Sequence, residues 1–168
     1  YPASSLTPER RDRTFGWLRK FIPPDVAVFG EAPFRNYTLF QRSDTVVNGG
    51  GLEHQSSQVD EVLTSQLDAS YLPGLYSHEF FHAWNVKRLR PADLVPYRYD
   101  DAQPTPWLWV SEGVTDYYGA LALVRGGVED STGFFGFIAD EIASVIDAPP
   151  TSVSDASLNA WINPVDGS

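Results

Sequence analysis

The chain is organised around residues 77–84, which read Ser77-His78-Glu79-Phe80-Phe81-His82-Ala83-Trp84. This stretch contains the pattern His-Glu-x-x-His and holds two of the three histidines in the chain. Residues four apart share one face of a helix, so both imidazoles can reach a single ion. Glu79 lies one step round the helix, where it can take a proton from a metal-bound water. The pattern predicts a zinc peptidase; the alternative is a pair of histidines in structural contacts.

A second long helix is predicted from about Thr105 to Arg125, ended by Gly126-Gly127. Its broad apolar face carries two carboxylates, Glu112 and Asp116, which are four apart and so lie on one side. Burying a carboxylate costs desolvation free energy unless a cation or hydrogen-bond donors pair with it, and this cost argues for a metal. The alternative is a partly exposed acidic edge.

The ligand set follows from what a catalytic zinc requires, which is three protein ligands and a position for water. With no cysteine in the chain, the ligands must be histidine or carboxylate. The class with a third histidine close by needs Gly at position 85 and His at 88, and Asn85 and Arg88 exclude it. We therefore expect Glu112 to be the third ligand.

Asp116 lies one helical turn beyond this ligand. Its carboxylate can accept the free ring N–H of a ligating histidine, preferably His78, and such a contact fixes the tautomer of the ring. A Glu-x-x-x-Asp pattern that follows His-Glu-x-x-His is much more specific than either half alone.

Three consecutive glycines, residues 49–51, mark a second unusual segment, which continues with Leu52, Glu53 and His54. Glycines lack side chains and relax the backbone, so another chain can approach closely. The alternative is an ordinary glycine-rich hairpin turn.

The remaining elements are predicted from spacing and from breaker residues. A first helix opens at Thr7-Pro8 and stops at Pro23-Pro24. Residues 25–30 and 36–41 read as two strands of one small sheet, and residues 55–68 as a loop that runs into a short helix. The motif helix should extend from residue 75 or 76 to 88 or 89.

Other features complete the helical part. Lys87, Arg88 and Arg90 are interpreted as the basic end of the motif helix, closed by Pro91. A third helix is expected from residue 131 or 132 to about 147, followed by a short turn at 155–161. Its inner stripe should consist of Phe134, Ile138, Ile142 and either Val145 or Ile146.

Composition indicates one folded domain. The chain has 168 residues, 42% of them apolar and 14% aromatic, which is enough for a core. A formal net charge of −10 disfavours nucleic acid or an anionic membrane as a partner. There is no apolar run long enough to span a membrane and no signal-peptide pattern. The chain begins at Tyr1 and has no methionine, so we interpret it as a piece of a longer protein with flanking domains.

The motifs resemble a known family. His-Glu-x-x-His followed by Glu-Gly-x-x-Asp is similar to the gluzincins, zinc peptidases built like thermolysin. Longer runs across about residues 45–125 resemble the glycyl aminopeptidase family, related to aminopeptidase N. Three runs carry the likeness: Gly50-Gly51-Leu52-Glu53-His54, His78-Glu79-Phe80-Phe81-His82-Ala83-Trp84-Asn85-Val86-Lys87-Arg88-Leu89-Arg90-Pro91, and Trp109-Val110-Ser111-Glu112-Gly113-Val114-Thr115-Asp116-Tyr117-Tyr118.

The resemblance implies an α+β, thermolysin-like zinc peptidase core, a single partial catalytic domain over residues 1–168. Residues 1–56 would form a helix and a small sheet, and residues 57–168 a mostly helical part with the zinc site. In the related aminopeptidases, the strand that corresponds to residues 50–54 binds the substrate backbone. This gives Gly50 and Gly51 a role in substrate binding, and Glu53 the role of gripping the N-terminal amine. Leu52 and His54 differ from aminopeptidase N, so its side-chain preference does not transfer.

These expectations describe a zinc-dependent aminopeptidase that acts on peptides, with Glu79 as general base. Two alternatives stay open: a zinc endopeptidase without amine recognition, and a non-catalytic zinc-containing fragment that binds peptides. Gluzincins also use a Tyr or His to stabilise the oxyanion. The candidates for that donor are four tyrosines, Tyr97, Tyr99, Tyr117 and Tyr118, or a residue beyond Ser168.

Overall fold

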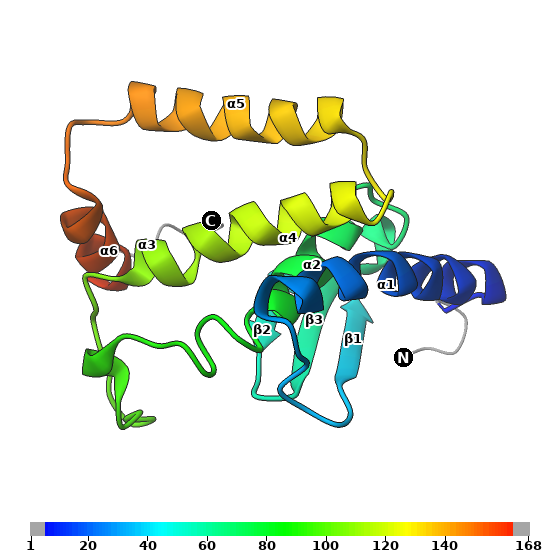
Figure 1. Ribbon diagram of the computed structural model, residues 1–168, viewed down its shortest axis with the longest axis horizontal. Coiled ribbons are helices and arrows are strands. Elements are labelled where there is room, and N and C mark those ends of the chain that lie inside the picture. Colours follow the sequence, from blue (N-terminus) through cyan, green and yellow to red (C-terminus); the bar gives the residue numbers. More distant parts are fainter. Residues whose placement is uncertain (1–5, 163–168) are drawn as a thin grey trace.

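In the computed structural model, which describes residues 6–162, a small sheet with a long N-terminal helix is followed by a mostly helical part (Figure 1). The expected α+β class is confirmed. The helices and strands, in chain order, are α1 (Pro8–Phe29), β1 (Thr38–Asp44), β2 (Gly50–Glu53), β3 (Ser57–Leu63), α2 (Leu72–Phe81), α3 (Leu108–Ser111), α4 (Gly113–Arg125), α5 (Ser131–Asp147) and α6 (Val153–Ile162).

The sheet has the strand order β1-β3-β2, with β1 parallel and β2 antiparallel to the central β3. The strand expected near residues 50–54 is confirmed as β2, but the loop expected over 55–68 is wrong, because β3 lies there. The sheet therefore extends past residue 56. Gln58, Asp60 and Val62 alternate on the buried face of β3. Two polar residues in buried positions hide this strand from a hydrophobic pattern.

The first helix begins as expected, with the Thr7 hydroxyl accepting from the backbone N–H of residue 10 and Pro8 in the first turn. It does not stop at Pro23-Pro24, and the strand expected over residues 25–30 is wrong, because α1 continues to Phe29. A proline at 24 leaves the Lys20 carbonyl without its helical donor, and Gly126 at the end of α4 packs against that carbonyl. Tertiary packing therefore overrides the local break.

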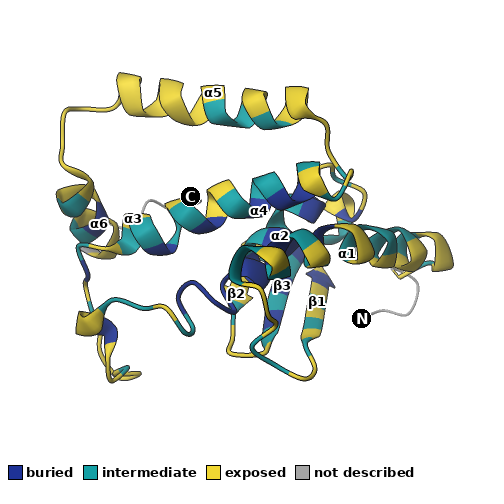
Figure 2. Ribbon diagram, in the orientation of Figure 1, coloured by how far each residue is buried: buried dark blue, intermediate teal, exposed yellow. Residues whose placement is uncertain are grey.

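The core lies between the sheet, α1 and α2, and aromatic rings dominate it. Phe80 of α2 makes edge contacts with the rings of Phe21 and Tyr37, at centroid distances of 6.3 and 4.9 Å. The Trp84 ring stacks on Phe29, 5.4 Å away and 7° from parallel. These contacts anchor the motif helix, and Figure 2 shows its buried position among the surrounding elements.

The motif helix is shorter than expected. It ends at Phe81, and the chain then turns through residues 82–84 to a bridge between Asn85 and Leu89. The interpretation of the basic cluster as a helix end is therefore wrong. Arg88 instead donates to the carbonyls of Gln55, Ala83 and Pro33, which ties three segments together.

The second long helix is broken at Glu112 into α3 and α4. The backbone N–H of Asp116 still donates to the Glu112 carbonyl at 2.8 Å, so the expected one-turn spacing holds. The two side chains are about half exposed, at 46% and 50%, so the expected buried stripe is wrong for them. The argument for a metal therefore depends on how the donors converge.

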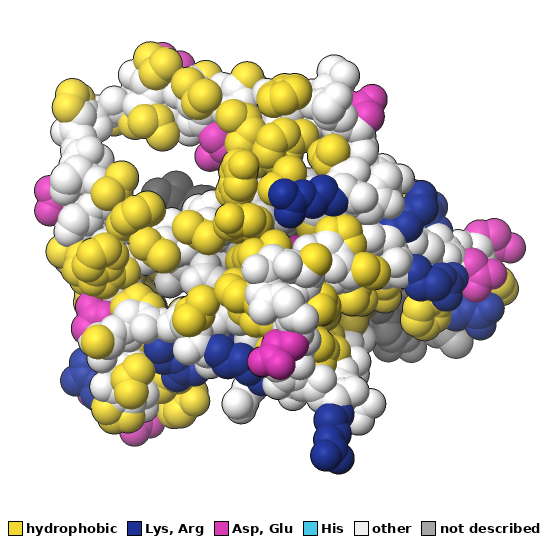
Figure 3. All heavy atoms as spheres, in the orientation of Figure 1, with side chains coloured by type: hydrophobic (Ala, Val, Ile, Leu, Met, Phe, Trp, Pro, Cys, Tyr) yellow, Lys and Arg dark blue, Asp and Glu magenta, His cyan; other side chains and the backbone are white. Residues whose placement is uncertain are grey.

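The third helix has the expected bounds, but its stripe is not buried. Phe134 packs edge-on against Tyr117, whereas Ile142, Val145 and Ile146 are 55–74% exposed. Figure 2 shows α5 almost wholly exposed, and Figure 3 shows hydrophobic side chains along it. The expected final turn is the longer helix α6, which Ser157 joins to α3 by accepting from the Trp109 N–H. None of the helices in the described part of the chain could cross a membrane.

Candidate metal centre and active site

Three side chains from two helical segments converge on one point. The Nε2 atoms of His78 and His82 lie 3.0 Å apart, and each lies 3.4 Å from Oε2 of Glu112. Glu112 lies at the break between α3 and α4, His78 lies in the last turn of α2, and His82 is the residue directly after that helix. The structure thus brings together the three residues that were predicted as metal ligands.

The other nitrogen of each ring is already engaged. Nδ1 of His78 lies 2.6 Å from Oδ1 of Asp116, and Nδ1 of His82 lies 2.6 Å from the Asn85 carbonyl oxygen. A carboxylate and a carbonyl can only accept, so both rings carry their proton on Nδ1. When both Nε2 atoms are deprotonated, their lone pairs face each other and the Glu112 carboxylate. Facing lone pairs repel unless a cation lies between them.

The donor set fits zinc. A tetrahedral ion with bonds of about 2.0–2.1 Å keeps its ligand atoms about 3.3 Å apart, close to the observed 3.0 and 3.4 Å. Two imidazoles and one carboxylate form a common ligand set of catalytic zinc peptidases. Zinc-bound histidine rings are commonly oriented by a carboxylate at the other ring nitrogen, and the contact of His78 Nδ1 with Asp116 has this form.

The electrostatics of the centre favour positive charge. Burial lowers the pKa of His78, but hydrogen bonds to Asp116 and Glu112 outweigh burial and raise this pKa to about 10, so Nε2 carries a proton that a bound cation would replace. Burial raises the pKa of Glu112, yet its hydrogen bonds to His78 and His82 lower it to about 2. The centre therefore holds a carboxylate ready to bind a cation.

Glu79 is buried beside this centre, with 5% of its surface exposed. Burial raises its pKa to about 7, against the opposing effect of His78 and His82. Its Oε2 atom is buried with no hydrogen-bond partner. Gly51 of β2 packs against this side chain so closely that a Cβ at residue 51 would overlap the carboxyl group. The close approach predicted for the glycine segment is therefore made by Glu79 itself.

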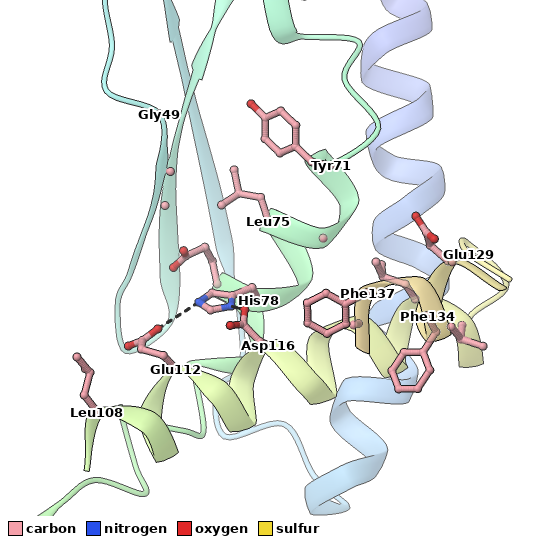
Figure 4. Close-up of a pocket in the computed structure, with 18 of the residues that line it drawn as sticks. Gly49, Tyr71, Leu75, His78, Leu108, Glu112, Asp116, Glu129, Phe134 and Phe137 are labelled. Carbon is pink, nitrogen blue, oxygen red and sulfur yellow. Dashed lines mark hydrogen bonds and ion pairs between the residues drawn. The ribbon is translucent and has the colours of Figure 1, made fainter. Parts of the chain in front are cut away.

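A cavity of about 1060 Å³ opens over these groups. Figure 4 shows the carboxylates of Glu112 and Asp116 on either side of the His78 ring, with aromatic rings of α5 further along the wall. The metal-centre side of the cavity is lined by Gly50, Gly51, His78, Glu79, Glu112 and Asp116. The rest of the wall is largely apolar, and Leu75, Leu108, Phe134, Phe137 and Trp161 form much of it.

Glu53 is placed differently from the two glycines. It is not among the described residues that line the cavity, and its Oε1 pairs with Nζ of Lys87 at 3.0 Å. It nevertheless lies two residues from Gly51 on β2, so it projects from the same face of the strand, towards Glu79.

The four candidate tyrosines for oxyanion stabilisation are not among the described residues that line the cavity. Tyr97 covers Lys87 and Arg90, Tyr99 is 92% exposed, and the Tyr118 ring stacks on Phe81. Tyr117 packs against the Tyr118 and Phe134 rings. Among the described lining residues the tyrosine is Tyr71, whose hydroxyl donates to Gln66.

Sequence reasoning missed one supporting residue, Asn85. Its backbone oxygen holds His82, while its Nδ2 donates to the carbonyls of Val110 and Ser111 and to Thr115 Oγ1, all within 3.0 Å. It therefore joins one histidine to the segment that carries Glu112. The only signal in the sequence was a polar residue among apolar ones directly after the motif.

Comparisons with known proteins agree with the geometry. A family model described as M61 glycyl aminopeptidase matches residues 72–167. The structure is similar to an aminopeptidase N family protein from Idiomarina loihiensis, with a TM-score of 0.80 and 28% sequence identity over 89% of this chain. The chain spans 28% of the length of that protein. No curated protein matches the chain.

Proposed function

The chain belongs to the M61 glycyl aminopeptidase family, and on that premise we propose that it is a zinc-dependent aminopeptidase that removes N-terminal residues from peptides. The family supports a peptidase acting on peptide substrates. The observation that carries the zinc assignment is the convergence of two Nδ1-protonated imidazoles and one carboxylate beside a buried glutamate.

His78, His82 and Glu112 would hold the ion, and Asp116 would orient the His78 ring. A bound zinc would polarise the scissile carbonyl and lower the pKa of an attacking water. The convergence and the spacing of the donor atoms support this assignment over a purely structural pair of histidines.

Glu79 is the proposed general base. It lies next to His78 in the chain and lines the same cavity. A base works best when its pKa lies near the working pH, and burial raises the pKa of Glu79 to about 7. In this role its carboxylate, which lines the cavity, takes the proton of the attacking water and passes it to the leaving amine.

The glycines of β2 leave room for a substrate beside the proposed metal centre. Gly50 and Gly51 line the cavity without side chains, so an extended peptide can approach the exposed edge of β2. In this proposal the strand binds the substrate backbone and Glu53 receives its terminal amine.

A second candidate, an endopeptidase with the same centre, is favoured by one observation. The carboxylate that should bind the amine is paired with Lys87, and Glu53 is not among the described lining residues. Peptides with free and with acetylated N-termini separate the two functions. An aminopeptidase that depends on Glu53 should reject the acetylated peptides.

The test of the proposal is made on the full-length protein. We expect zinc in the purified wild type, and we expect Glu79→Gln to keep the zinc and the fold while peptide hydrolysis falls by about 10²- to 10⁴-fold. A wild type without metal, or undiminished hydrolysis in the variant, would overturn it.

A further inference from the structure

The Glu53–Lys87 pair is partly buried and held on several sides. The Lys87 side chain is 17% exposed and that of Glu53 22%, with 3.0 Å between Nζ and Oε1. The ring of Tyr97 lies under the ammonium at 5.6 Å and under the Arg90 guanidinium at 4.3 Å. This lysine is therefore not a mobile surface side chain.

The backbone around Lys87 is fixed as well. Its N–H donates to the His82 carbonyl, and its own carbonyl accepts from Arg90 Nη2. The next residue, Arg88, is bound to three carbonyls from separate segments. The early end of α2 at Phe81 makes this path possible, because a continuing helix would carry position 87 elsewhere.

The pair lies close to the reacting groups. Glu53 is two residues along β2 from Gly51, about 6.6 Å, and Gly51 contacts the Glu79 carboxyl group. A substrate amine on Glu53 would therefore share its carboxylate with the Lys87 ammonium. A carboxylate can accept at both oxygens, but two ammonium groups on one carboxylate repel each other.

We propose that Lys87 sets the strength of amine recognition: its ammonium neutralises Glu53 and weakens the binding of a free N-terminal amine. The inference rests on the proposed function, in which Glu53 receives that amine. Lys87 acts through Glu53 and is a specificity-determining residue. It makes free-amine affinity low while leaving the chemistry at the metal centre unchanged.

The experiment compares Lys87→Met, which removes the charge and keeps the length, with Lys87→Arg, which keeps the charge. Both are measured in the full-length enzyme on a peptide with a free N-terminus. We expect KM to fall about three- to tenfold in Lys87→Met, with kcat unchanged. Lys87→Arg should keep the KM of the wild type. Zinc content and melting temperature report whether each variant is folded.

A double-mutant cycle isolates the contact. In a Glu53→Gln background, Lys87→Met should no longer change KM. The proposal is overturned if Lys87→Met raises KM or leaves it unchanged, or if its effect persists in that background. A role in folding alone would instead lower kcat, zinc content and melting temperature together.

The same variants separate this inference from the function beneath it. If Glu53→Gln leaves KM for the free amine unchanged, the amine-binding role of Glu53 fails and the role of Lys87 fails with it. If Glu53→Gln raises KM and Lys87→Met has no effect, only the role of Lys87 is refuted.

Discussion

Gly51 of β2 lies so close to Glu79 of α2 that the only space for a Cβ atom is already filled by the glutamate carboxyl group. This contact sets the distance between the strand and the proposed base. Any residue other than glycine at this position would displace the glutamate carboxyl group.

Gly51→Ala should therefore impair catalysis more than stability. The carboxyl group is the flexible end of its side chain, so it can swing away at a cost of about 1–3 kcal/mol, but the base then leaves its position. We expect kcat to fall about 100-fold or more. Gly16→Ala is the control, because nothing lies within 4 Å of the added Cβ. A Gly51→Ala enzyme with wild-type kcat would contradict the assignment.

Two carboxylates of the centre should differ in their effect on metal binding. Glu112 offers a ligand atom, whereas Asp116 contacts the far nitrogen of His78. Glu112→Gln should abolish stoichiometric zinc binding, while Asp116→Asn should bind zinc about 10- to 100-fold more weakly. Competition with a chromophoric chelator measures both affinities, and a chelator should lower the melting temperature of the wild type. Equal losses in both variants would refute the distinction.

Asn85→Asp tests the link between the two halves of the centre. The change removes the amide donors to the Val110 and Ser111 carbonyls and places negative charge against them. We expect the free energy of unfolding to fall by about 2–4 kcal/mol and zinc affinity to fall with it. Asn159→Asp, an exposed position on α6, makes the same chemical change as a control. Urea denaturation with and without zinc measures both effects.

The pH dependence of stability should reveal Asp60. Burial raises its pKa to about 7, against the hydrogen bonds from Gln58. Between its ordinary pKa and this raised value, the folded state keeps a proton that the unfolded state has released. The contribution of Asp60 to the free energy of unfolding is therefore fully present below about pH 4 and is lost as the pH rises to about 7. The loss is about 1.4 kcal/mol for each pH unit over which only the unfolded state is ionised.

Asp60→Asn should flatten this dependence, because an amide does not titrate. Urea unfolding of both proteins from pH 4 to 8, with chelator present to remove the effect of metal binding, gives the comparison. Curves that stay parallel across this range would contradict a raised pKa for Asp60.

Features that depend on nearest neighbours were predictable. The start of α1 at Thr7-Pro8 and the bounds of α5 follow from caps, breakers and spacing, whereas the strand at Gly50–Glu53 was expected only from the family resemblance. The one-turn spacing of Glu112 and Asp116 also holds, although the helix breaks between α3 and α4. Each of these is decided within one or two turns of backbone.

Features that depend on distant partners were not predictable. α1 runs through two prolines, and Gly126 at the end of α4 packs against the Lys20 carbonyl that Pro24 leaves without a helical donor. β3 carries buried Gln58 and Asp60, which no apolar pattern reveals. The motif helix ends early, and the side chain of Asn85 then bonds across to α3 and α4.

The sequence by itself determined the chemistry of the centre, since the spacing of His78, Glu79 and His82 fixes their relative positions on any helix. Only the tertiary structure decided which residues of the sheet lie beside the centre. The contact of Gly51 with Glu79 and the pairing of Glu53 with Lys87 join segments that are 28 and 34 positions apart. Such contacts depend on how the sheet packs against the end of α2, which no local pattern encodes.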